Sequence, residues 1–340
     1  MKILVTGGAG YVGSRLVPHL LDRGHQVDVL DKLVFGPEGL APVKDRVRLK
    51  VKDVRKTAPE DFRGYDAVVH LAGISNDPTA EFNPEANLSI NTAGTEHAAR
   101  MAKQAGVKRF VFASSCSIYY SMKPDDALRD EVFPVDPQAP YSKSKYLAEK
   151  ALLALAADDF TPVCLRKGTI HGQSGRMRYD LVVNTFTKDA FDRRQLTIHA
   201  GGRMWRPILH MSDAVEAYRL AVEAPREKVH GQVVNVLSDN LQVLKLAREV
   251  RRELETHCGV KLDMNVQEVG AVRSYRVDGS KAESVLGFRP AAPFGPEVEA
   301  MWSALEGGID FTQPIYYNIR WLELLCEMRD RLSRMGGDAL

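Results

Sequence analysis

The chain has 340 residues, enough for one large domain or two moderate ones, and its 44% hydrophobic and 26% charged residues are typical of a globular protein with a sizeable core. Its formal net charge of +2 comes from scattered acids and bases, which argues against nucleic acid, a membrane surface or an acidic protein as a partner. Four widely spaced cysteines suit neither a disulfide framework nor a metal cluster, and the N-terminus lacks an apolar leader, so we expect a cytoplasmic protein with no metal site.

Short apolar runs alternate with helical patterns over the first 115 residues. A glycine ends each helical pattern, at Gly24 and Gly106. Strands that alternate with helices form parallel sheets covered on both faces. We therefore predict strands at 2–7, 26–31, 66–73 and 109–115, and helices at 11–24 and 91–106.

The second half of the chain is more mixed. We predict a long loop at 166–180, a strand at 233–239, and helices at 180–191, 243–257 and 318–335, the last with an apolar stripe that packs on the body or on a partner. The fold class is therefore α/β, a doubly wound parallel (Rossmann) sheet with a smaller mixed C-terminal substrate domain. We place the dinucleotide-binding domain at 1–165, with later segments returning to it, and an interleaved, mainly substrate-binding domain at 166–340.

A glycine-rich turn follows the first strand. In "TGGAGYVGS", Gly7, Gly10 and Gly13 allow a tight turn and let backbone amides approach a pyrophosphate at the start of the next helix. Asp31 ends the second strand, where a carboxylate accepts hydrogen bonds from ribose hydroxyls and repels a 2′-phosphate. This favours NAD over NADP as the cofactor, although Lys32 next to it acts in the opposite direction.

Tyr141 and Lys145, in "YSKSK", are four residues apart at the start of a predicted helix, so their side chains share one face. A phenol with a pKa of about 10 is a poor base near neutral pH, but a nearby ammonium favours the phenolate. Ser114, Ser115 and Ser117 end a strand upstream and offer a hydroxyl opposite the phenol. We predict a catalytic triad of Ser115, Tyr141 and Lys145.

The combination of "TGGAGYVG", Asp31, "HLAG", "SSCSIYY" and "YSKSK" resembles the extended short-chain dehydrogenase/reductase family, the NAD-dependent nucleotide-sugar epimerases and dehydratases, over residues 2 to about 290. The resemblance implies that Tyr141, Lys145 and Ser115 carry proton transfer. It also implies cofactor contacts from the glycine turn, from Lys145, from the ends of the next strands and from a residue below the fourth strand: Tyr11, Val12, Asp31, Lys32, Asp53, Val54, Leu71, Ala72, Gly73 and Asn91.

Two departures from the family pattern bear on the reaction. Sugar 4,6-dehydratases of the family carry an acidic residue just after the catalytic Ser or Thr, where this chain has Cys116 and Ser117, so dehydration is disfavoured. The fucose synthases have a cysteine in a similar motif, but it aligns with Ser117 and not with Cys116. In "LRKGTIHG", Thr169 stands where the family commonly has Asn, and His171 where it has Tyr.

The resemblance places the nucleotide diphosphate of a sugar substrate in the C-terminal half. Arg206 matches a phosphate-binding arginine, and Arg273 begins the family's closing motif as a second anion ligand. The predicted substrate contacts are Ser75, Asn76, Ser117, Thr169, His171, Asn184, Arg206 and Arg273.

These patterns predict an NAD-dependent epimerase of a nucleotide-diphosphate sugar, acting at C4 through a transient 4-keto sugar with Tyr141 as the base. One alternative is a nucleotide-sugar 4-ketoreductase or an atypical dehydratase. Another is a non-catalytic dinucleotide sensor, since fold alone does not determine function. The resemblance further implies a homodimer formed through the helix that bears Tyr141 and Lys145 and through its neighbour.

Overall fold

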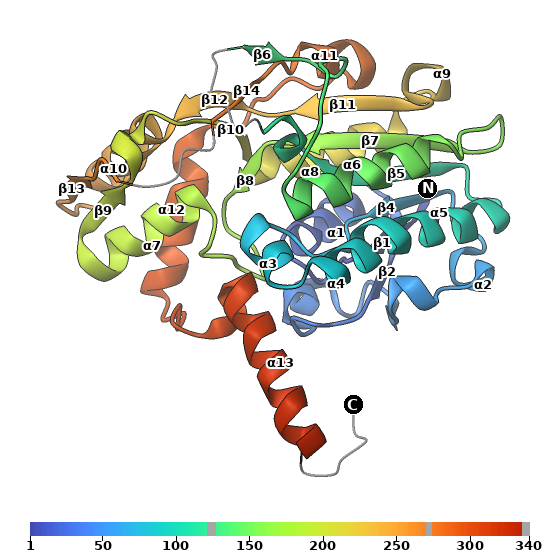
Figure 1. Cartoon of the computed structure of the whole chain (residues 1–340), viewed down its shortest axis with the longest axis horizontal. Helices are drawn as coiled ribbons and strands as arrows, with labels where there is room; N and C mark the ends of the chain where they lie inside the picture. The colour runs from blue at the N-terminus through green and yellow to red at the C-terminus, as the bar shows by residue number, and fades with distance from the viewer. Residues whose placement is uncertain (121–126, 270–273, 335–340) are drawn as a thin grey trace.

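A seven-stranded parallel sheet organises the molecule, as Figure 1 shows. The structure is a computed structural model that describes residues 1–120, 127–269 and 274–334. Across the sheet the strand order is β3-β2-β1-β4-β5-β7-β11. The doubly wound parallel sheet predicted from the alternating pattern is confirmed. Its strands are β1 (Lys2–Thr6), β2 (Gln26–Asp31), β3 (Leu49–Val51), β4 (Ala67–His70), β5 (Arg109–Ser115), β7 (Thr161–Lys167) and β11 (Gln232–Val236).

Both faces of this sheet are buried because helices cover each of them. Successive side chains of a strand point to opposite faces, so they enter different hydrophobic clusters. In β1, Ile3 and Val5 pack in one cluster with the helices α1 (Gly13–Asp22) and α8 (Met211–Glu223). Leu4, between them, packs in the other cluster with α5 (Gly94–Gln104) and α6 (Pro140–Leu153). The apolar runs in the sequence therefore correspond to strands enclosed on both faces.

The remaining strands form smaller sheets, and the remaining helices pack around these sheets and the central sheet. The other helices are α2 (Pro59–Phe62), α3 (Asp77–Phe82), α4 (Pro84–Leu88), α7 (Val182–Arg193), α9 (Arg226–Val229), α10 (Val243–His257), α11 (Ser280–Leu286), α12 (Phe294–Glu306) and α13 (Asn318–Arg334). The other strands are β6 (Leu128–Arg129), β8 (Thr169–His171), β9 (Gln195–Ile198), β10 (Trp205–His210), β12 (Asp239–Gln242), β13 (Asp263–Val266) and β14 (Arg276–Val277).

Several predicted boundaries differ from the structure, and two of these differences have a clear physical reason. The loop predicted at 166–180 contains β8, whose partner β10 lies more than thirty residues away in the chain, so local sequence did not indicate the pairing. The helix predicted from residue 91 begins with a π-helical turn at Ser89–Ala93, and α5 starts only at Gly94.

The C-terminal helix α13 projects from the body, as Figure 1 shows. Among its described residues only Asn318 is buried, although the Trp321 indole donates a 2.6 Å hydrogen bond to the backbone oxygen of Val34. Leu322, Leu325 and Cys326 are half-buried as well, so the apolar stripe of α13 contacts the body over the first half of the helix. In the described ranges, no helix combines the length and apolar character required to cross a membrane.

Candidate active site

A cavity of about 1530 Å³ opens at the carboxyl ends of the parallel strands. Its walls come from the turns after β1, β2 and β4, the ends of β5 and β7, the start of α6, and α13. Cavities that hold one small ligand usually enclose about 300–1,000 Å³. This cavity is therefore large enough for a dinucleotide together with a second ligand.

The glycine turn after β1 brings backbone to the cavity wall. Gly7 has a φ of +75°, and a Cβ there would lie 2.6 Å from the backbone nitrogen of Ala72. A Cβ on Gly13 would lie 2.5 Å from the Gly7 oxygen, at the first residue of α1. Both positions therefore require glycine. Gly7, Gly10, Tyr11, Val12 and Gly13 all line the cavity, which matches the predicted pyrophosphate cradle.

The acidic groups after β2 and β3 lie on the same side of the cavity. The Asp31 carboxylate accepts hydrogen bonds from the backbone N–H groups of Ala9 and Leu33, at 3.0 and 2.8 Å. Each of its oxygens retains a second lone pair for a ribose hydroxyl. The Lys32 ammonium lies 3.2 Å from Asp53, so its charge is directed to that carboxylate. This arrangement weakens the argument that Lys32 favours a 2′-phosphate.

Asn91 supports the turn after β4. Its side-chain amide donates to the Ile74 oxygen at 2.9 Å, and its side-chain oxygen accepts from the Ile74 N–H at 2.8 Å. The amide also bonds Asn87 and Ser144, which ties the turn to α4 and α6. Asn91 is buried behind the cavity wall that Leu71, Ala72 and Gly73 form, and Asp53 and Val54 line the same cavity.

The three residues predicted as the triad meet in the cavity. Ser115, at the end of β5, and Tyr141, in the first turn of α6, both line the cavity, and the Ser115 hydroxyl acts to lower the pKa of the Tyr141 phenol. The Lys145 ammonium lies 6.0 Å from the centroid of the Tyr141 ring and donates to the Ala113 oxygen at 3.0 Å. Pro140 occupies the first position of α6, where its missing N–H costs nothing.

The ionisation of this pair differs from the sequence expectation. Burial raises the pKa of Tyr141 to about 12, and Asp77 acts in the same direction, while Ser115 and Arg178 act against it. Burial also lowers the pKa of Lys145 to about 7, with repulsion from Lys167. The groups of the protein therefore keep the phenol neutral, so a phenolate favoured by Lys145 together with an oxidised nicotinamide ring stays a prediction.

The predicted substrate contacts divide into three groups. Ser75, Asn76, Ser117, Thr169 and Arg206 line the cavity. His171 and Asn184 do not line it. Arg273 lies outside the described residues.

His171 and Asn184 are buried away from the cavity surface. The His171 ring packs 4.7 Å from that of His210 and 5.0 Å from that of Phe294, between centroids. Asn184 donates to the Tyr11 hydroxyl at 3.0 Å and accepts from the Gly172 N–H at 3.2 Å. Asn184 thus holds the loop after β8 against the glycine turn, whereas His171 packs inward against the rings of His210 and Phe294.

Sequence reasoning missed several charged residues in the cavity wall. Arg178 donates to both oxygens of Asp180, at 2.9 and 3.0 Å, and to the Ser75 hydroxyl at 2.7 Å. Lys167, the last residue of β7, and Asp77, the first of α3, also line the cavity. The positions of Lys167 at the end of β7 and of Asp77 shortly after β4 were a signal that could have indicated these two residues. Arg178 lies in the loop between β8 and α7, where no local pattern indicates it.

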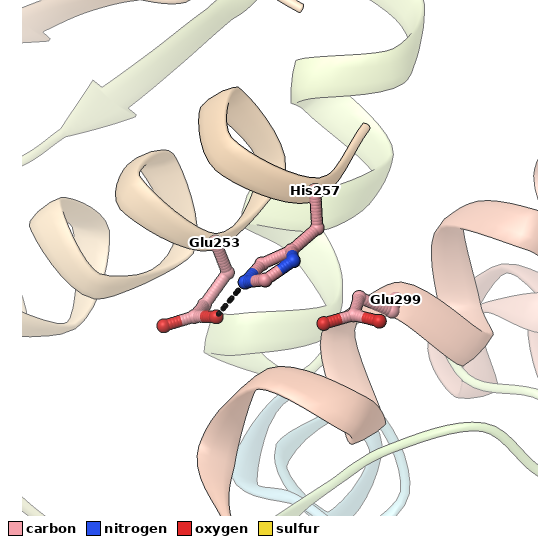
Figure 2. Close-up of side chains that lie close together, drawn as sticks. All are labelled: Glu253, His257 and Glu299. Carbon is pink, nitrogen blue, oxygen red and sulfur yellow. Dashed lines mark ion pairs between the residues drawn. The ribbon is translucent and has the colours of Figure 1, made fainter. Parts of the chain in front are cut away.

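A second group of ionisable side chains lies between α10 and α12, as Figure 2 shows. Ligand atoms of Glu253, His257 and Glu299 lie within 4.8 Å of one another. Glu253 is also paired with Arg252, at 2.7 Å, and none of the three lines the cavity. We assign this group no role in the site.

Comparisons with known proteins agree with this geometry. A model of the NAD dependent epimerase/dehydratase family matches residues 3–236. A dTDP-glucose 4,6-dehydratase of Streptomyces niveus is 30% identical over 313 residues, which cover 86% of this chain and 89% of that protein. A putative UDP-glucose 4-epimerase of Methanocaldococcus jannaschii is 27% identical over 292 residues, 85% of this chain and 93% of its own.

Solved structures of similar fold include DesIV, a dTDP-glucose 4,6-dehydratase from Streptomyces venezuelae determined with NAD bound. It has a TM-score of 0.79, 25% sequence identity, and coverage of 93% of this chain and 100% of its own. The relatives include both dehydratases and an epimerase, so their names indicate a family and not one reaction. With the glycine turn, the parallel sheet and the family model in agreement, the chain belongs to the NAD dependent epimerase/dehydratase family.

Proposed function

We propose that this protein is an NAD-dependent epimerase of a nucleotide-diphosphate sugar that inverts the configuration at C4. The observation that carries the proposal is one cavity lined by the glycine turn, by Asp31 and by Ser115, Tyr141 and Lys145. A cavity of about 1530 Å³ has room for a dinucleotide and a sugar nucleotide side by side.

The residues around the glycine turn fit a dinucleotide. Gly7 and Gly13 leave space that a Cβ would fill, and α1 directs its positive N-terminal end toward the cavity. Asp31 would hold the adenosine ribose, and the wall of Leu71, Ala72 and Gly73 would face the rest of the cofactor. When bound, NAD supplies reversible hydride acceptance at its nicotinamide ring.

The protein's own side chains would transfer the proton of the sugar hydroxyl. Tyr141 would accept the proton of the C4 hydroxyl, and the Ser115 hydroxyl would hold the same oxygen. Lys145 would hold the cofactor ribose and add positive charge beside the phenol when protonated. The sugar would pass through a 4-keto form, and rotation of that ketone in the cavity would let the hydrogen return to its other face.

A second candidate is an atypical dehydratase, favoured by Asp77 and Lys167. Both residues line the cavity, Asp77 close enough to act on the pKa of Tyr141 and Lys167 on that of Lys145, and either could donate a proton to a leaving hydroxyl. The residue directly after Ser115 cannot take that role. Cys116 is fully buried, its thiol donates to the Arg166 oxygen at 3.1 Å, and burial raises the pKa of that thiol.

A panel of sugar nucleotides tests the proposal. The purified protein with NAD is incubated with UDP-, GDP-, dTDP- and CDP-sugars, and the products are identified by NMR and mass spectrometry. Inverted sugar without net change in absorbance of the reduced cofactor supports epimerisation. A product lighter by one water would identify a dehydratase, and product that requires stoichiometric NADH or NADPH would identify a ketoreductase; either result would contradict the proposal.

A further inference from the structure

Lys167 is a cation in the cavity that the mechanism above leaves without a function in epimerisation. It ends β7 and is the register partner of Ser115 at the end of the adjacent strand β5. Neighbouring strands lie about 4.8 Å apart, and paired residues of parallel strands point to the same face of the sheet. The Lys167 side chain therefore starts one strand away from the hydroxyl proposed to hold the reacting oxygen.

The Lys167 ammonium has no carboxylate within ion-pairing distance in the described parts of the chain. It lies 5.9 Å from the centroid of the Tyr218 ring, and Cys116 and Arg178 are the groups that act on it electrostatically. By contrast, Lys32 is paired with Asp53, and Arg178 with Asp180. The positive charge of Lys167 is thus not compensated by the protein, whereas that of Arg178 is.

Holding an ammonium in a partly enclosed site without an opposite charge nearby costs free energy. Burial lowers the pKa of Lys167 to about 8, with a further lowering by Arg178 and an opposing effect of Cys116. Near neutral pH most of the lysine nevertheless carries its charge. A protein that retains such a charge in a ligand cavity commonly receives the opposite charge from the ligand.

The position of Lys167 points to the sugar and not to a diphosphate. The glycine turn proposed for the cofactor pyrophosphate follows β1, three strands away from β7 in the order β1-β4-β5-β7. Arg206, the residue predicted for the substrate diphosphate, lies on β10, in a separate sheet. Lys167 instead lies beside Ser115, where the ring carbon acted on and its neighbouring carbons would be.

We propose that Lys167 is a specificity residue that binds a carboxylate on the sugar ring, so that the substrate is a nucleotide-diphosphate hexuronate and not a neutral hexose. This inference rests on the proposed function and deepens it. A C6 carboxylate is attached to the carbon next to C4, which matches the one-strand separation between Lys167 and Ser115. A charge-assisted hydrogen bond from the ammonium would distinguish the carboxylate from the hydroxymethyl group of a neutral hexose.

Binding of two sugar nucleotides that differ only at C6 tests the inference. Titration of the NAD-saturated protein with UDP, GDP, dTDP and CDP first identifies the base. Calorimetry then compares the matched pair for that base, such as UDP-glucuronic acid and UDP-glucose. We expect the hexuronate to bind about ten-fold tighter or more, since hydrogen bonds to charged groups are the stronger ones.

Variants assign the preference to Lys167. Lys167→Gln should weaken hexuronate binding about ten-fold and change hexose binding less than about two-fold, whereas Lys167→Arg should retain much of the preference. Lys245→Gln removes an exposed lysine on α10, outside the cavity, and should change neither. Thermal melting of each variant checks that it is folded.

The outcomes separate this inference from the proposed function. If the neutral hexose is bound and inverted, with no preference for the hexuronate, the inference is overturned and the proposed function stands. An equal loss of affinity for both sugars in Lys167→Gln also overturns it. If neither member of any pair binds the NAD-saturated protein, the proposed function fails, and this inference fails with it.

Discussion

At the scale of single residues, the main feature of the site is a phenol that its own protein keeps protonated. Burial raises the pKa of Tyr141, and the nearest lysine does not offset the effect, because burial lowers the pKa of Lys145 as well. Two buried groups that each lose hydration favour their neutral forms. A base at neutral pH therefore needs added positive charge, which an oxidised nicotinamide ring would carry.

The substitution Tyr141→Phe tests the role of the phenol. It removes the hydroxyl and keeps the ring, so it should lower kcat about a thousand-fold while NAD affinity near neutral pH changes little, since a general base contributes about 10²–10⁴-fold. Steady-state assays on the best sugar nucleotide measure this. Tyr146→Phe is the matched control on the same helix, where the ring lies 4.9 Å from the Lys150 ammonium. Equal losses in the two variants would contradict a catalytic role for Tyr141.

Proton release on cofactor binding tests the ionisation. The pKa of Tyr141 is about 12 in the protein without cofactor, and the positive ring of bound NAD⁺ should lower it. At a pH between the pKa without NAD⁺ and the pKa with NAD⁺, binding of NAD⁺ therefore releases a proton from Tyr141. NAD⁺ affinity should therefore rise with pH, by at most about ten-fold per pH unit. Calorimetry at pH 9 in buffers of different ionisation enthalpy counts the protons. At pH 9 Lys145, with a pKa of about 7, is already mostly neutral and contributes little.

Two controls accompany the proton count. NADH carries a neutral ring and should release no proton, and Tyr141→Phe should abolish the release seen with NAD⁺. Equal release with NADH and NAD⁺ would mean that another group loses the proton.

At the scale of elements, a π-helical turn joins the cofactor side of the cavity to the catalytic helix. Ser89–Ala93 interrupts the run from α4 to α5 and turns Asn91 toward Ile74, Asn87 and Ser144. Such turns recur at functional sites because the extra residue re-aims a side chain. Here one amide satisfies both backbone groups of Ile74 in the turn after β4.

Asn91→Ala should lower the free energy of unfolding by about 1–3 kcal/mol, since it leaves the part-buried backbone N–H and oxygen of Ile74 without the partner that Asn91 supplies. It should also weaken NAD binding, because the adjacent wall of the cavity loses its support. Urea denaturation and cofactor titration measure the two effects. Asn265→Ala, at an exposed position on β13, should change stability by less than about 0.5 kcal/mol. A loss for Asn91→Ala no larger than that control would refute the bridging role.

At the scale of the whole molecule, the helix that bears Tyr141 and Lys145 exposes a leucine to solvent, as does the adjoining helix α4. Leu147 on α6 is 36% exposed, and Leu88 on the adjoining α4 is 41% exposed. We propose that the surface around these two leucines joins two copies of the chain, as the family resemblance implies. Its position on the helix that carries Tyr141 and Lys145 would couple assembly to the geometry of the site.

Leu147→Glu places a charge in that surface and should convert a dimer to a monomer, because desolvating a carboxylate opposes association. Sedimentation velocity at several concentrations measures the state. Leu128→Glu, at an exposed leucine on β6, is the matched control and should remain dimeric. A monomeric parent protein would contradict the proposed assembly.

Much of this architecture was readable from local sequence. Five strands of the parallel sheet, the glycine turn and the Tyr141–Lys145 pair depend on spacing along one strand or one helix, and the structure contains each of them, whereas β3 and β7 were not predicted. Period-2 and period-3.6 patterns and the steric freedom of glycine act over a few residues, so one sequence is sufficient to show them.

The tertiary structure decided what depends on residues distant in the chain. It turned His171 and Asn184 away from the cavity, brought Arg178 and Lys167 into it, and paired Lys32 with Asp53. It also determined ionisation, since the pKa of Tyr141 depends on burial by segments far from the motif. Burial, long-range pairing and net charge in a cavity are sums over many distant groups, and no local pattern contains them.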